Sequence, residues 1–84
     1  MKVHDTFLLK IFSPFQTFFE GEALAVSATN QTGPFDILAK HEDFISILSP
    51  CKIVVQTTSQ KREFDVNRGI LQVKNSRVWI FMNI

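Results

Sequence analysis

The sequence predicts an all-β domain, a small two-layer antiparallel β-sandwich or flattened barrel of about eight to ten short strands. Runs rich in Phe, Val, Ile and Thr recur about every ten residues, and Pro, Gly, Asn and Ser separate them. No longer window carries the period of an amphipathic helix without an interruption. The chain has 84 residues, the size of one domain with a modest core, so residues 1–84 are expected to form a single unit.

Turn-forming residues divide the first half of the chain into five expected strands, at 7–12, 16–19, 22–29, 34–38 and 44–48. Pro14 stops the first strand because proline cannot donate a hydrogen bond to a neighbouring strand. Gly21 is expected to turn the chain after the second strand. Pro34 suggests a strand start or a sheet edge for the fourth, and Pro50 ends the fifth.

The second half predicts two hairpins, formed by 52–57 with 61–66 and by 69–74 with 77–82. Apolar residues alternate at period two in these runs, so one side of each strand should face the core. The side chains expected to point inward are Leu24, Val26, Phe35, Ile37, Ile53, Val55, Phe64, Val66, Ile70, Val78 and Ile80.

The last expected strand is apolar on both of its alternating faces, from Val78 to Met82. A strand with one face in water should alternate apolar with polar residues. Trp79 and Phe81 therefore either cover a sheet end or a loop, or form an exposed aromatic face for a partner. The sequence leaves both interpretations open.

Charge and cysteine content exclude several classes of protein. Nine basic and eight acidic side chains are interspersed and give a net charge of +1, which argues against nucleic-acid binding. Cys51 is the single cysteine, so no internal disulfide can form and a reducing, cytoplasmic compartment is expected. No run approaches the roughly 18 apolar residues of a membrane span, so membrane contact should be indirect.

Candidate chemistry is sparse. His41, Glu42 and Asp43, with Asp36 nearby in sequence, make a weak metal pattern because three or four convergent ligands are needed. Cys51 has no histidine beside it to act as a base. The glycines are isolated, and none opens a helix as a phosphate loop does. We therefore expect no catalytic, cofactor-binding or metal-binding residues and no enzymatic activity.

Four segments occur in an order that resembles a known family: FFEGEALAVSA, TGPFDILAKHEDF, FISIL and FDVNRGILQV. They resemble the N-terminal β-domain of the ε subunit of rotary ATP synthases, over roughly residues 8–81. The resemblance implies a non-catalytic central-stalk subunit that docks the γ subunit and the c ring for rotational coupling. It also implies a place at the inner face of a membrane that transports protons or sodium ions. The chain ends at Ile84 without the two-helix C-terminal domain of most ε subunits.

The resemblance also assigns residues to partners. Ser13, His41 and Ser46 match positions that face γ, and Thr32, Gly33 and Pro34 match the loop that faces the c ring. The chain departs from the family pattern at Pro34, Asp36, Ala39 and Arg68. The alternative is a stand-alone ε-like module for protein interaction or self-assembly, without a role in ATP synthase. Without γ to cover it, the exposed aromatic face is expected to drive self-association of the isolated chain in crystals or at high concentration.

Overall fold

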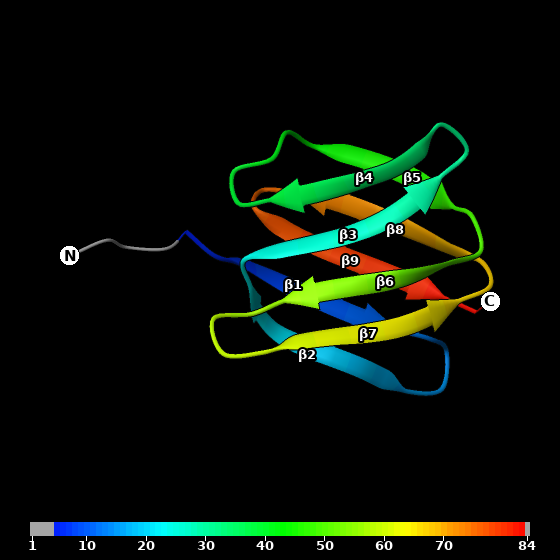
Figure 1. Cartoon of the computed structure of the whole chain (residues 1–84), viewed down its shortest axis with the longest axis horizontal. Helices are drawn as coiled ribbons and strands as arrows, with labels where there is room; N and C mark the ends of the chain where they lie inside the picture. Colours follow the sequence, from blue (N-terminus) through cyan, green and yellow to red (C-terminus); the bar gives the residue numbers. More distant parts are fainter. Residues whose placement is uncertain (1–4, 84) are drawn as a thin grey trace.

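The computed structural model describes residues 5–83, and its regular structure in this range is β-strand throughout. The nine strands are β1 Phe7–Phe12, β2 Thr17–Ala23, β3 Ala25–Asn30, β4 Gly33–Leu38, β5 Phe44–Leu48, β6 Cys51–Gln56, β7 Lys61–Val66, β8 Gly69–Lys74 and β9 Arg77–Met82. They form two sheets that pack face to face (Figure 1). The predicted β-sandwich is confirmed. No helix able to cross a membrane occurs within residues 5–83.

The two sheets differ in size and in pairing. The larger has five strands in the order β2-β1-β9-β8-β5, and the smaller has four in the order β4-β3-β6-β7. Every strand pair is antiparallel except β1 with β9, which is parallel (Figure 1). A tight turn makes the two strands that it joins antiparallel. Almost the whole chain separates β1 from β9, so no turn fixes their relative direction. The expectation of a purely antiparallel sandwich is therefore corrected at this one pair.

Apolar side chains from both sheets fill the space between them. Among the fully buried residues are Ile11 and Ile80 of the larger sheet and Val26, Ile53 and Val55 of the smaller one. Along β8 buried and exposed residues alternate strictly, as expected for a strand with one face in the core. Within residues 5–83 no polar or charged side chain is buried. The core is thus held by apolar packing alone.

The predicted turn at Gly21 is wrong. β2 continues through this residue, which pairs with Leu9 of β1. An added Cβ at Gly21 would lie 3.9 Å from the Phe19 ring, an ordinary van der Waals contact, so this strand position does not require glycine. The chain turns at Leu24 instead, where the backbone N–H donates to the Gln56 carbonyl at 2.8 Å. That bond ties the turn to the smaller sheet.

The inward assignment of Ile70 is also wrong. Ile70 lies on the outer face of β8 and is 36% exposed, while Leu71 and Val73 fill the core. A register shift of one residue moves every side chain of a strand to the opposite face of the sheet. Because β8 pairs Leu71 with the buried Ile80, Leu71 faces the core and Ile70 faces outward. Of the other predicted inward residues, three are half-buried, namely Leu24, Phe35 and Phe64. The remaining seven are buried as predicted: Val26, Ile37, Ile53, Val55, Val66, Val78 and Ile80.

Two glycines of the larger sheet provide a matched test of this packing. An added Cβ at Gly69 would lie 2.9 Å from the backbone carbonyl oxygen of Phe81, which cannot move without displacing β9. Gly69→Ala should therefore lower the free energy of unfolding by about 1–3 kcal/mol. In Gly21→Ala the added methyl group makes only ordinary contacts with a side chain, so the free energy of unfolding should change by less than about 1 kcal/mol. Urea denaturation of both variants measures the difference, and equal stabilities would contradict the predicted clash.

Candidate protein-binding surfaces

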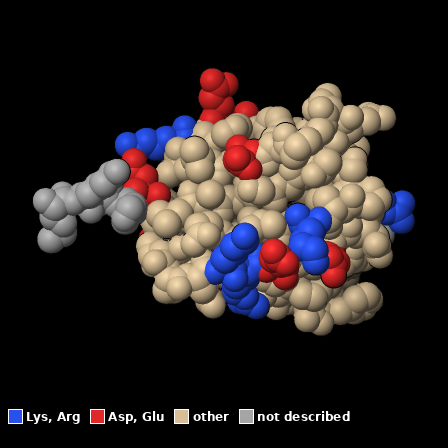
Figure 2. Space-filling view, viewed as in Figure 1, with Lys and Arg blue, Asp and Glu red and all other residues tan. Residues whose placement is uncertain are grey.

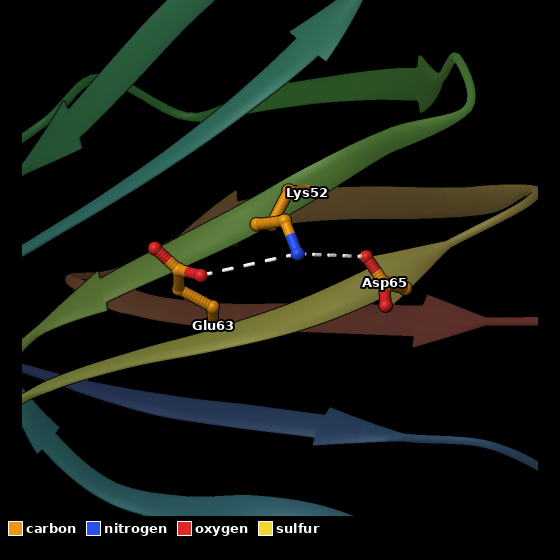
Figure 3. A network of polar contacts seen from close by, with 3 residues as sticks. All are labelled: Lys52, Glu63 and Asp65. Atoms are coloured by element: carbon orange, nitrogen blue, oxygen red, sulfur yellow. Dashed lines mark ion pairs between the residues drawn. The ribbon is translucent and has the colours of Figure 1, made fainter.

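The outer face of the smaller sheet is polar. Lys52 of β6 lies between two acidic residues of β7, with its Nζ 3.9 Å from a Glu63 carboxylate oxygen and 3.2 Å from one of Asp65 (Figure 3). Figure 2 shows this side of the molecule, where basic and acidic side chains lie next to one another. On β3 and β4 the Ser27 hydroxyl donates to the Asp36 carboxylate at 2.5 Å. Such exposed, mutually paired polar groups are typical of a face in water.

The outer face of the larger sheet carries a row of apolar residues. Phe12, Phe81, Ile70 and Ile47 are aligned across β1, β9, β8 and β5 by the strand registers, and we call these four residues the apolar row. The Phe12 and Phe81 rings stack with centroids 5.1 Å apart and an interplanar angle of 31°. Ile47 is 73% exposed at the far end of the row. The row is an apolar stripe that the described chain leaves partly uncovered.

A second row beside it is mixed in character. It consists of Lys10, Trp79, Gln72 and Ile45, again one residue from each of the same four strands. The Lys10 Nζ lies 5.1 Å from the centre of the Phe12 ring, a cation–π distance that joins the two rows. Trp79 and Phe81 help to line a shallow depression between the rows.

The two aromatic residues singled out in the sequence thus lie on the outer face of the central strand β9. Both are half-buried, because side chains of the neighbouring strands flank them. The inward positions of β9 are taken by Val78, Ile80 and Met82. The structure therefore places both rings on a sheet face, which is the location that the second interpretation requires. That this face binds a partner stays a prediction.

The residues that resemble γ contacts do not form one cluster. Ser46 lies on the edge strand β5, and Ser13 lies in the β1–β2 turn, with β9 and β8 between their strands. Ser13 is held there by its backbone N–H, which donates to the Gln16 carbonyl at 2.8 Å. His41 precedes β5; its Nδ1 is 2.7 Å from the Glu42 carbonyl oxygen, and its ring packs against Phe44. His41 and Ser46 therefore share one side of the molecule without Ser13.

The loop that resembles the c-ring contact is the β3–β4 turn with the start of β4: Thr32 lies in the turn, and Gly33 and Pro34 are the first two residues of β4. Asn30 organises it. Its Oδ1 accepts hydrogen bonds from the backbone N–H of Thr32 at 2.9 Å and from the Thr32 hydroxyl at 2.7 Å. Its Nδ2 donates to the Ser46 hydroxyl at 3.0 Å. Asparagine side chains commonly accept a hydrogen bond from the backbone N–H two residues ahead in a turn, and this is the arrangement here.

The residues of the weak metal pattern are dispersed. Asp36 is bonded to Ser27 on the outer face of the smaller sheet, whereas Asp43 accepts a hydrogen bond from the backbone N–H of Asn75 at 3.2 Å. In the described range 5–83 no group of three or more His, Cys, Asp or Glu side chains is arranged to hold a metal ion. Cys51 is half-buried on β6. The features that this structure offers for function are surfaces and turns.

The fold and its surfaces define a class: a small two-sheet β-sandwich with a polar outer face on one sheet and an apolar row on the outer face of the other. The sequence model of the ATP synthase delta/epsilon chain β-sandwich domain matches residues 6–84. The chain therefore belongs to this family.

Similar proteins agree with this assignment. The ATP synthase epsilon chain of Clostridium novyi (strain NT) is 37% identical over 76 residues, which cover 89% of this chain and 58% of that protein. The epsilon chain of Xanthomonas campestris pv. campestris (strain B100) is 37% identical over 80 residues, covering 94% and 57%. The chain thus spans a little over half the length of these relatives.

Two solved structures share the fold. One chain of the Tetrahymena thermophila mitochondrial ATP synthase, in a structure of its central stalk and c-ring, superposes with a TM-score of 0.82 at 14% identity. The match covers 92% of this chain and 63% of that one. A chain of the Euglena gracilis mitochondrial ATP synthase superposes with a TM-score of 0.85 at 19% identity, covering 92% and 50%.

The stacked ring pair of the apolar row should contribute measurable stability. Aromatic pairs are worth about 0.5–1.5 kcal/mol beyond their buried area. A double-mutant cycle with Phe12→Leu and Phe81→Leu should therefore give a coupling free energy of about that size. Chemical denaturation of the wild type, both single variants and the double variant measures it. Additive effects would show that the rings do not act as a pair.

Proposed function

We propose that this chain is an ε-type central-stalk subunit of a proton- or sodium-translocating rotary ATP synthase, which docks the γ subunit and the c ring and performs no catalysis. The observation that carries the proposal is the family match over residues 6–84, joined by relatives named ATP synthase epsilon chain. In this proposal the chain works on the cytoplasmic side, at the inner face of the membrane, and meets the membrane only through the c ring.

The sandwich suits a part that transmits torque. Its two sheets enclose a core of closely packed apolar side chains, and such interiors resist compression. The central strands β1 and β9 are paired on both sides along their lengths. A load applied to one surface would therefore be carried by the whole domain, with no flexible connection in between.

The geometry suggests how γ would lie on the sandwich. Ser13 directly follows Phe12 at one end of the apolar row, and Ser46 directly precedes Ile47 at the other end. A partner that reached both serines across the sheet would cover the row and lie beside Trp79. Aromatic side chains near the centre of an interface commonly dominate its binding energy. We therefore assign the γ-facing surface to the outer face of the larger sheet and its β5 edge.

The c-ring contact in this proposal is the β3–β4 turn. This turn lies at the same end of the sandwich as the β1–β2 turn that carries Ser13 (Figure 1). The bonds of Asn30 to Thr32 hold its shape, and Gly33 adopts a positive φ of 122° that side chains rarely tolerate. A turn fixed in this way presents Thr32 and Pro34 in one arrangement.

Binding assays with purified γ and c ring from the same source test both contacts. Phe81→Lys places a charge at the centre of the proposed γ face and should weaken γ binding by at least about tenfold, which corresponds to about 1.4 kcal/mol. Pro34→Arg should weaken c-ring binding and leave γ binding unchanged. Gln56→Lys adds the same charge to the outer face of the smaller sheet and serves as the control.

Thermal unfolding of each variant must show that the fold is retained. If Phe81→Lys and Trp79→Lys both leave γ binding unchanged, the assigned face is wrong. If the wild-type chain binds neither γ nor the c ring, the stalk function itself is contradicted. The stand-alone interaction module is then the better description.

A further inference from the structure

Three of the four sheet edges carry features that block pairing with another strand. Natural proteins protect edges with charges, prolines and bulges, because an open edge offers unpaired backbone groups to other chains. β7 has four charged residues, Lys61, Arg62, Glu63 and Asp65. β4 has Pro34 and Asp36. β2 has Glu20 and Glu22, and its register with β1 is shifted between Ile11 and Phe12.

The fourth edge, β5, has none of these features. Its sequence is Phe-Ile-Ser-Ile-Leu, without charge or proline, and its register with β8 is regular over all five residues. Ile45 and Ile47 point to the outer face and are 67% and 73% exposed. β8 pairs with one side of the strand, and the other side is a sheet edge. Asn30 approaches from that region and bonds the side chain of Ser46. Just beyond the strand the backbone N–H of Ser49 donates to the Thr29 carbonyl of β3 at 2.9 Å, so the edge open to pairing is that of Phe44–Leu48.

We propose that β5 pairs antiparallel with β5 of a second copy of this chain, so that two five-stranded sheets join into one. The strand is nearly a palindrome about Ser46. A two-fold axis at Ser46 would place Ile45 of each copy opposite Ile47 of the other. The two resulting pairs would lie on the same outer face. It would also place Phe44 opposite Leu48. Both are apolar cross-strand pairs of the kind that stabilises sheets.

The surroundings of the strand are compatible with this register. The residues that flank it would meet as Asp43 with Ser49 and Glu42 with Pro50, so no like charges face each other. A two-fold axis perpendicular to the sheet gives a closed, isologous dimer in which the same patch serves both copies. The edge of each apolar row, at Ile47, would then be covered by Ile45 of the second copy.

Sedimentation equilibrium of the isolated chain tests the proposal. The interface is small, so weak association is expected, and concentrations from about 10 μM to about 1 mM should be covered. The apparent mass should rise from 9.6 kDa towards twice that value. A chain that stays monomeric over the whole range overturns the proposal.

Charge pairs test the register. Ile45→Lys with Ile47→Lys puts lysine opposite lysine at both cross-strand pairs and should abolish the dimer. Ile45→Lys with Ile47→Glu puts lysine opposite glutamate in the antiparallel register and should restore it. Both side chains are exposed, so neither double variant should unfold the domain, which thermal unfolding checks. If the lysine–lysine variant dimerises as strongly as the wild type, or if the lysine–glutamate variant does not dimerise, the proposed pairing is wrong.

Ile70→Lys is the matched control. It adds a charge to the same outer face on β8, which is an interior strand, and should leave the dimer intact. Loss of the dimer in this variant would mean that the sheet faces stack, which overturns edge pairing. The proposal does not rest on the stalk function, since these measurements contain neither γ nor c ring. Failure of the binding assays would contradict the stalk function and leave this result unchanged.

Discussion

The parallel pairing of β1 with β9 is the constraint on which the rest of the structure depends. It joins the first strand to the last, for example Lys10 to Trp79, which are 79 − 10 = 69 residues apart. Closing so long a loop costs conformational entropy before any contact is gained. Without β9 the larger sheet falls into two pieces, β2 with β1 and β8 with β5. The last strand therefore completes the core, and the domain gains its stability as a unit.

The same strand explains why the two outer faces differ. β9 is central, so its inward residues must fill the core, while its outward residues lie in the middle of a sheet face. The aromatic residues Trp79 and Phe81 occupy those outward positions, and Phe81 stacks on Phe12 of the parallel neighbour. On the smaller sheet the outward positions of the central strands carry no aromatic residue; Ser27 of β3 lies opposite Val54 of β6. A rigid strand thus carries the apolar surface assigned here to partner binding.

The sequence predicted best the strands that are bounded by clear turn residues, as in the pairs β6–β7 and β8–β9. It failed at Gly21, because glycine permits a turn but does not impose one, and the pairing with Leu9 continues the strand through this residue. It failed at Ile70, because Ile70 and Leu71 are equally apolar and the pairing with β9 decides which faces inward. The parallel β1–β9 pair and the bond from Asn30 to Ser46 depend on contacts far apart in the chain. Alternation within a single strand contains no information about them.

The protection of the other edges determines how far pairing through β5 could extend. A dimer about Ser46 uses both β5 edges and leaves β2 at each end of the joined sheet. β2 carries Glu20, Glu22 and a shifted register, so a third copy would meet charge and distorted geometry there. Association is therefore expected to close at two copies instead of growing into a fibre. Since Ser46 also lies in the surface assigned to γ, a chain paired in this way would have that edge covered until γ displaced the second copy.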